Sequence, residues 1–207
     1  SKLPGRYNFM LSLPQSDTEL ILEDALHDRG VSVERETELV GFAQDADGID
    51  AHLSTGGTNT DFRADYILGC DGAHSTVRKT LGLGFAGERY PETWSLADIR
   101  MDWPFGHGEG NLFMEPGGRV LFIISLPRGR FRGIANVPEA LSLLPVGSHV
   151  SEVIWQTDFT VSLRQVDSYA AGRAFLAGDA AHIHTPAGGR GMNLGIEDSC
   201  DFAERLA

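Results

Sequence analysis

The residues best suited to chemistry lie near the C-terminus, where an acid follows a short apolar segment and precedes a glycine-rich loop. Asp179 comes directly after Gly178, at the end of a strand predicted for residues 174–177. Farther along, Pro186 is followed by the loop at residues 188–191 and the start of a helix. A glycine-rich loop that opens a helix presents free backbone N–H groups and the positive end of the helix dipole. This order of residues predicts a site for an anionic or electron-rich ligand edge.

A second acid occupies a similar position earlier in the chain. Asp71 and Gly72 follow a strand predicted for residues 62–69, whose last part is apolar on both faces, as in a buried strand. A carboxylate at the carboxyl end of a strand lies where open α/β sheets bind ligands, and glycine lets a ligand approach the backbone. The same residues also suit a turn in which Ser75 caps a short helix that ends near Leu81. The sequence is compatible with both interpretations, a ligand site and a capped turn.

Two other patterns have the wrong context for the motifs that they match. Gly82, Gly84 and Gly87 fit G-x-G-x-x-G, but that dinucleotide fingerprint needs a strand before it and a helix after it. A predicted helix precedes these glycines, so we expect a turn. His182 and His184 are two positions apart, and we expect them on opposite faces of a strand. No third ligand is evident, and we predict no metal site. The sequence contains no G-x-S-x-G, C-x-x-C or H-E-x-x-H motif.

Hydrophobic periodicity and turn residues define the elements that must position these residues. A strand is predicted at residues 6–13, and a helix capped by Ser16 or Asp17 is predicted to reach Arg29, with Gly30 just beyond its end. Short strands are predicted at residues 31–33, 37–44 and 49–53. The spacing of apolar residues, among them Leu194 and Leu206, predicts a last helix. Between them lies a block that reads as an antiparallel sheet, with strands at residues 94–101, 111–115, 119–126, 131–137 and 153–163. Six aromatic residues are expected to fill its core: Trp94, Trp103, Phe113, Phe122, Phe131 and Trp155.

Composition excludes several classes of protein. The 207 residues include 17 Lys and Arg against 29 Asp and Glu, a net charge of -12, which argues against binding to nucleic acid. Cys70 and Cys200 are the two cysteines, and we expect buried free thiols in a cytoplasmic protein. No apolar run approaches the roughly 18 residues of a membrane span. The chain begins at Ser1 without a methionine, so we expect a fragment.

The motifs in this order resemble the flavin-dependent aromatic hydroxylases, which are single-component FAD monooxygenases of the para-hydroxybenzoate hydroxylase fold. The resemblance rests on Leu13-Pro14-Gln15, on Asp71-Gly72 through Arg78, on Gly178-Asp179 and on a flavin loop at residues 186–195. It implies a mixed α/β (α+β) fold, part of a three-layer FAD-binding domain intertwined with an antiparallel β-sheet substrate domain. Residues 1–12 and 89–165 would belong to the substrate domain. Residues 13–88 and 166–207 would form the FAD-binding domain, without its first βαβ unit.

The same resemblance implies a role for each motif residue. Gln15 would bond the ribityl or ribose part of FAD, and Asp179 a ribityl hydroxyl. Asp71 would hold the diphosphate–ribose region and, with Arg78, the approach of NAD(P)H. Pro186 would lie at the reactive edge of the isoalloxazine, and the N–H groups that open the last helix would face flavin N1 and O2. The cofactor-binding candidates are Gln15, Asp71, Gly72, Arg78, Gly178, Asp179, Pro186, Gly189, Gly191, Met192 and Asn193.

By this resemblance, the parent protein would use FAD, NAD(P)H and molecular oxygen to hydroxylate a small aromatic substrate through a flavin hydroperoxide. Residues 118–122 and 129–132 resemble the branch that acts on phenols and polyketides. A related flavoprotein with other chemistry (an epoxidase, a reductase or a drug-inactivating oxygenase) and a truncated, non-catalytic relative are the alternatives. No catalytic base is assigned, and the oligomeric state stays open. The stretch at residues 138–149 is shorter than the helical segment that the resemblance implies there. Because the first βαβ unit is missing, the adenine half of FAD would have few contacts, and we expect these 207 residues alone to bind FAD weakly and not to turn over.

Overall fold

A computed structural model describes residues 11–185 and 189–206, and it divides into two compact units. The first unit consists of residues 1–33 and 92–160, and the second of residues 34–91 and 161–207. The predicted mixed α/β class is confirmed by helices and antiparallel sheets in the same chain. Residues 13–33 group with the first unit, whereas the sequence analysis placed them with the FAD-binding residues.

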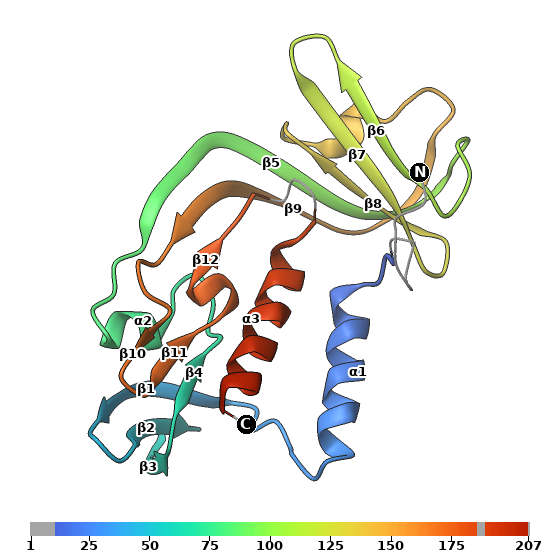
Figure 1. Ribbon diagram of the computed structural model, residues 1–207. Helices are drawn as coiled ribbons and strands as arrows, with labels where there is room; N and C mark the ends of the chain where they lie inside the picture. The colour runs from blue at the N-terminus through green and yellow to red at the C-terminus, as the bar shows by residue number, and fades with distance from the viewer. Residues whose placement is uncertain (1–10, 186–188, 207) are drawn as a thin grey trace. The chain divides into compact units, whose positions relative to one another are not determined.

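The first unit contains a helix and a sheet of long strands (Figure 1). The helix is α1 (Gln15–His27), and the short 3-10 helix η1 spans Ala140–Leu143. The strands of this unit have the order β9-β5-β8-β7-β6, and a sixth strand, β12 (His182–Ile183), pairs with the end of β9 in the second unit. The pairs β5–β8, β8–β7 and β7–β6 are antiparallel, which confirms the predicted arrangement. The strands of the unit are β5 (Ala86–Asp102), β6 (Gly110–Glu115), β7 (Arg119–Leu126), β8 (Arg130–Ala135) and β9 (His149–Gln165), of which β5 and β9 continue into the second unit.

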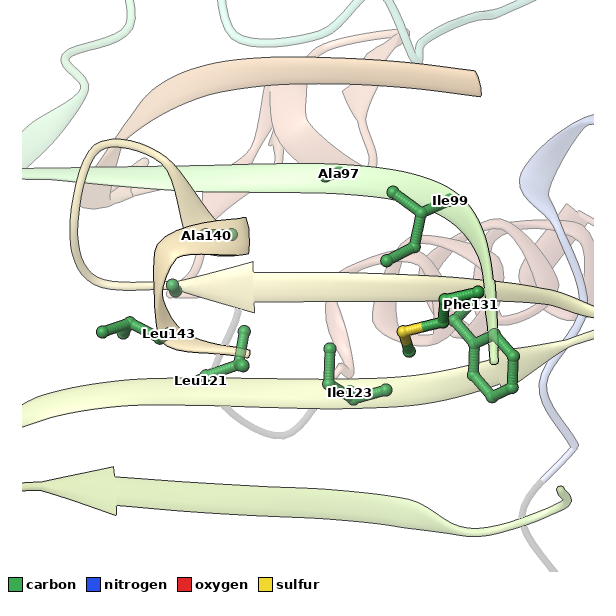
Figure 2. Close-up of a cluster of buried hydrophobic side chains, with 9 residues drawn as sticks. Ala97, Ile99, Leu121, Ile123, Phe131, Ala140 and Leu143 are labelled. Carbon is green, nitrogen blue, oxygen red and sulfur yellow. The ribbon is translucent and has the colours of Figure 1, made fainter. Parts of the chain in front are cut away.

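One face of this sheet packs into an apolar core. Figure 2 shows Ile99, Leu121, Ile123 and Phe131 pointing into this core from three neighbouring strands. Phe131 is fully buried, and the partly buried Trp103 and Phe113 pack against the same cluster. The prediction that all six aromatic residues fill the core is wrong for Trp155, which is 50% exposed. Phe122 is opposite the core face, because its neighbours Leu121 and Ile123 point inward and side chains alternate along a strand.

The second unit combines two small sheets with two short helical segments and one longer helix (Figure 1). In the first sheet, β1 (Thr37–Gln44), β2 (Ile49–Thr55) and β3 (Thr58–Ala64) pair antiparallel. The second sheet has the order β10-β11-β4, with β10 (Ala170–Ala171), β11 (Ala174–Leu176) and β4 (Ile67–Gly69); β11 and β4 are parallel. The remaining elements are α2 (Thr76–Thr80), the 3-10 turn η2 (Gly178–Ala180), β12 (His182–Ile183) and α3 (Gly191–Leu206). A core that includes Ile49, Val77, Val166, Ala174 and Leu176 joins these elements.

Several predicted boundaries are wrong. The expected strand at residues 62–69 is divided, because β3 pairs with β2 whereas β4 pairs with β11, and the chain must change sheets between them. Residues 31–33 are not a strand, nor are residues 11–13; residues 6–10 of that predicted strand lie outside the described residues. Pro14 is at the N-cap of α1, which has no side-chain cap, so the proposed Ser16 or Asp17 cap is wrong. Gly30 has a φ of +73°, as expected beyond a helix end.

Among the helices that the structure describes, none is both long enough and apolar enough to cross a lipid bilayer.

Candidate functional site

The two acidic motifs follow the parallel strands β4 and β11 and lie at the same edge of their small sheet. Gly69 at the end of β4 pairs with Leu176 at the end of β11. Asp71 follows the first strand, and Asp179 follows the second. Because parallel strands end at the same edge of a sheet, the structure brings both motifs to the position where open α/β sheets bind ligands.

Asp71 caps the short helix α2. Its Oδ2 accepts hydrogen bonds from the backbone N–H groups of Thr76 and Val77 at 2.6 and 3.2 Å, and its Oδ1 accepts the Ser75 hydroxyl at 2.5 Å. The Ser75 hydroxyl oxygen in turn accepts the backbone N–H of Arg78 at 3.0 Å, which confirms the predicted serine cap. Asp71 itself is exposed, and a carboxylate has about four acceptor positions, so capping leaves it capacity for a ligand.

Arg78 connects α2 to the η2 turn from inside the unit. The residue is 5% exposed, and its two terminal nitrogens donate to the carbonyl oxygens of Ala180 and Ala73 at 2.8 and 2.7 Å. Its guanidinium lies 3.9 Å from the centre of the Phe85 ring. Burial lowers the pKa of Arg78 from its ordinary value. The contacts therefore make Arg78 a link between the two acidic motifs, and its suggested role toward NAD(P)H stays a prediction.

The carboxylate of Asp179 is available to bind a ligand. It is exposed on the η2 turn and makes no side-chain hydrogen bond or ion pair with another described residue. The turn that carries it is fixed on both sides. The backbone N–H of Gly178 donates to Asp198 Oδ2 at 2.9 Å, and Arg78 holds the carbonyl of Ala180. A fixed turn with a free carboxylate is suited to bonding a hydroxyl group of a ligand.

The start of α3 provides the N–H donors that the sequence predicts. The backbone N–H of Leu194 bonds to the carbonyl of Arg190 at 3.0 Å, so the N–H groups of Gly191, Met192 and Asn193 precede the first turn bond. Gly189 has a φ of +61°, and the Asn193 amide approaches its carbonyl at 3.5 Å. Pro186 and Gly188 lie outside the described residues.

The η2 turn contacts α3 through two glycines. A Cβ built on Gly195 would lie 3.2 Å from the Cα of Gly178, and one built on Gly178 would lie 3.6 Å from the Cα of Gly195. Gly178 also has a φ of +57°, which favours glycine. The absence of side chains at both positions lets the helix approach the turn that carries Asp179.

His182 has a partner that the sequence analysis missed. Its Nε2 lies 2.6 Å from Asp198 Oδ2, and its side chain is 5% exposed. The expectation that His182 and His184 point to opposite faces of a strand is wrong, because side chains two positions apart along a strand lie on the same face. The centres of the two rings are 4.7 Å apart. Across the described ranges, His, Cys, Asp and Glu form no group arranged to hold a metal ion.

Burial, together with the charge of Asp198, raises the pKa of Tyr169, whose ring lies 6.0 Å from that of His182.

Gln15 belongs to the first unit and opens α1. It is exposed, and its amide nitrogen donates to Glu19 Oε1 at 2.8 Å. Its predicted contact with the cofactor stays a prediction.

The first unit has polar side chains on the sheet face opposite its core. Asp98, Arg132 and Ile124 lie directly across from one another on β5, β8 and β7, so their side chains share this face. Arg132 donates from Nε and Nη2 to the two Asp98 carboxylate oxygens at 2.7 and 2.9 Å, and this pairing raises the pKa of Arg132 above its ordinary value. Ile124 also borders a cavity of about 320 Å³ in the same unit, which is lined by Ser12, His107, Gly108, Glu109, Gly110, Phe122, Ile124, Ser125, Leu126 and Pro127.

Comparison with known proteins identifies the family. The sequence matches the FAD binding domain family over residues 2–133 and 135–207, and the chain belongs to that family. It is 34% identical over 222 residues to 6-methylpretetramide 4-monooxygenase of Streptomyces rimosus, covering 100% of this chain and 40% of the relative. It is 32% identical over 227 residues to pentachlorophenol 4-monooxygenase of Sphingobium chlorophenolicum, covering 100% of this chain and 42% of that protein. The chain therefore spans less than half the length of these curated relatives.

Solved structures give the same assignment. CabE, an aromatic hydroxylase from angucycline biosynthesis, is 30% identical with a TM-score of 0.77 over 96% of this chain and 44% of its own. The p-nitrophenol 4-monooxygenase PnpA of Pseudomonas putida DLL-E4 is 26% identical with a TM-score of 0.87, over 98% of this chain and 56% of its own. The predicted resemblance to the FAD-dependent aromatic hydroxylases is confirmed.

The second unit offers groups that fit a flavin. Asp179 presents a free carboxylate beside a helix start with free N–H donors, and Gly178 and Gly195 keep the turn and the helix in close contact. A carboxylate suits the hydroxyl groups of a ribityl chain, and a helix N-terminus stabilises negative charge on an adjacent ring.

Proposed function

We propose that the protein carrying this chain is an FAD- and NAD(P)H-dependent monooxygenase that hydroxylates a phenolic or polyketide aromatic substrate. The observation that carries the proposal is the pairing of β4 with β11, which places the Asp71 and Asp179 motifs at one sheet edge. Relatives named as monooxygenases of a pretetramide and of pentachlorophenol support the reaction and the aromatic class of substrate. The cytoplasmic location expected from cysteine usage is part of the same proposal.

The residues of the second unit would hold the cofactor in this protein. Asp179 would accept a ribityl hydroxyl, and the N–H groups of Gly191, Met192 and Asn193 would face the pyrimidine edge of the flavin. Asp71 and Gly72 would lie toward the diphosphate–ribose part, with Gln15 supplying a further polar contact. When bound, FAD would supply the redox chemistry that joins NAD(P)H oxidation to oxygen transfer. The helix N-terminus would stabilise negative charge without reorganisation, because its N–H groups are already fixed.

The first unit would bind the substrate on the sheet face that carries Asp98 and Arg132. The cavity beside Ile124 and Phe122 offers an apolar wall for an aromatic ring. Arg132 uses Nε and Nη2 for Asp98, and its Nη1 makes no side-chain hydrogen bond to another described residue. A guanidinium with spare N–H donors suits a phenolate or enolate oxygen.

The test uses full-length protein supplied with FAD, NADPH or NADH, and a panel of phenols and aromatic polyketides. We expect at least one compound to stimulate NAD(P)H oxidation and to gain one oxygen atom on its ring, as read by mass spectrometry. The Asp179→Asn variant should lose FAD affinity, whereas Asp201→Asn, on the exposed side of α3, should behave like the parent. Failure of every compound to stimulate oxidation, in protein that binds FAD, would contradict hydroxylation.

A second function is favoured by similarity to two relatives that are named as rifampicin monooxygenases. The chain is 33% identical over 227 residues to rifampicin monooxygenase of Streptomyces venezuelae, and covers 46% of that protein. Oxygenation of a drug would then be the physiological reaction. Adding rifampicin to the same panel distinguishes the two, because the substrate that gives the higher kcat/KM identifies the reaction.

A further inference from the structure

One oxygen atom of Asp198 joins three segments of the second unit. Asp198 Oδ2, on α3, lies 2.9 Å from the backbone N–H donor of Gly178 on η2 and 2.6 Å from Nε2 of His182 on β12. Asp198 is 24% exposed at its side chain and His182 is 5% exposed, so the His182 bond is largely shielded from water. Hydrogen bonds to an ionised acceptor in such surroundings are stronger than neutral ones.

This contact fixes the protonation pattern of the imidazole ring. A carboxylate accepts hydrogen bonds and does not donate, so Nε2 of His182 carries a proton. The other nitrogen, Nδ1, is buried and has no hydrogen-bond partner among the described residues. The rings of Tyr169 and His184 lie nearby, with centres 6.0 and 4.7 Å from that of His182. Asp198 is therefore the one described group that orients the His182 ring by hydrogen bonding.

The same carboxylate determines where Asp179 lies. Asp179 directly follows Gly178, whose N–H is bonded to Asp198, and the turn is closed on its other side by the bond from Arg78 to Ala180. The Asp179 carboxylate has no partner of its own within the described structure. Its placement relative to the start of α3 thus depends on the contacts of the turn, of which the Asp198 hydrogen bond and the packing of Gly195 against Gly178 come directly from α3.

We propose that Asp198 is a positioning residue, braced by His182, that fixes Asp179 relative to the N-terminus of α3 so that both can bind one flavin. The proposal rests on the proposed function, because it assigns the purpose of the contact to FAD binding. Asp198 acts through Asp179 and does not touch the cofactor. Replacing Asp198 should therefore weaken FAD binding only in protein that still contains Asp179.

The test is a double-mutant cycle on full-length protein, with the FAD dissociation constant measured by fluorescence quenching. Asp198→Asn should weaken FAD binding about tenfold when Asp179 is intact, the effect of losing one charge-assisted bond. In the Asp179→Ala background, the same change should weaken binding less than about twofold. Equal effects in both backgrounds would overturn the proposal, because a general loss of structure does not depend on Asp179. Asp201→Asn on the same helix is the matched control and should leave the dissociation constant unchanged.

A second variant and a second measurement cover the case in which Asp198→Asn does not fold. His182→Phe keeps a ring at this position and removes both nitrogens, so it should fold and should also weaken FAD binding only when Asp179 is present. In the parent protein without FAD, ¹⁵N NMR should show His182 protonated at Nε2; protonation at Nδ1 alone would overturn the proposal. Wild-type protein that fails to bind FAD would overturn the proposed function as well. If the wild-type protein binds FAD but the effects of the Asp198 and Asp179 substitutions on the FAD dissociation constant are additive, only the positioning role is overturned.

Discussion

Gly178 and Gly195 lie backbone to backbone, and a Cβ built on Gly195 would come 3.2 Å from the Cα of Gly178. The first residue opens the η2 turn before Asp179, and the second lies within α3. Glycine is unfavourable inside a helix by roughly 0.5–1 kcal/mol relative to alanine. The close contact explains why α3 has glycine at this position.

Replacing Gly195 by alanine should destabilise the protein, although alanine is the better helix former. The helix gains about 1 kcal/mol from the exchange, but the new methyl group meets backbone, and overpacking of this kind costs about 1–3 kcal/mol. We expect a net loss of about 1 kcal/mol in the free energy of unfolding, measured by urea denaturation. Gly191→Ala is the control, because nothing lies within 4 Å of its Cβ. Equal stability of the two variants would show that the contact is not close in solution.

The glycines at positions 82–87 should differ sharply in their tolerance of alanine. Gly87 lies in β5 with a φ of +141°, and a Cβ there would come 2.0 Å from the carbonyl oxygen of Leu163. Gly84 has only the Asp167 carboxylate at 3.9 Å. We expect Gly87→Ala to cost about 3 kcal/mol or more in unfolding free energy and Gly84→Ala to stay within about 0.5 kcal/mol. A phosphate-binding loop would instead make Gly84 sensitive in FAD binding, so the pair of variants also tests the assignment as a turn.

Local signals were sufficient for much of the fold. Alternation and turn residues predicted β1 and β7 with their observed bounds, and the helix predicted to reach Arg29 corresponds to α1. These signals failed where pairing with a strand distant in the sequence determines where a strand begins and ends. Tyr66 begins the apolar end of a strand predicted to be continuous over residues 62–69, but near this residue the chain leaves the sheet of β3 and joins β11.

The two acidic residues of the candidate site could be predicted from the sequence, but the residues that bond to their segments could not. Asp71 and Asp179 could be found because each follows an apolar run and stands beside glycine. Asp198 could not be found, because its bonds to Gly178 and His182 join residues 20 and 16 positions apart and depend on how α3 packs. The expected burial of Cys70 and Cys200 is wrong, since both residues are exposed.

Breaking the ion pair of Asp98 and Arg132 should cost more than removing it entirely. Asp98→Asn leaves the partly buried guanidinium without its charged partner, and we expect a loss of about 2 kcal/mol, below the 3–5 kcal/mol typical of fully buried pairs. The double variant Asp98→Leu with Arg132→Met keeps the volume without a charge and should lie within about 1 kcal/mol of the parent. Chemical denaturation of the parent, the single variant and the double variant measures their free energies of unfolding. A double variant less stable than Asp98→Asn would mean that the pair contributes net stability to the sheet.

Cys70 should react with alkylating agents several-fold more slowly than Cys200 at neutral pH, although both residues are exposed. Although the residue as a whole is exposed, its neighbours partly shield the thiol from water, and this desolvation raises the pKa of Cys70. The hydrogen bond with Ser199 opposes the increase, and the charges of Asp71 and Asp198 add to it. Because the thiolate is the nucleophile, a raised pKa lowers the reactive fraction below that pKa. Peptide mass spectrometry after iodoacetamide treatment gives both rates, and their ratio should approach one as the pH rises through the pKa of Cys70. The Asp198→Asn variant should speed Cys70 and leave Cys200 unchanged, since it removes one of the negative charges that disfavour the thiolate. A Cys70 that reacts as fast as Cys200 at neutral pH would show that neither burial nor the carboxylates act on this thiol.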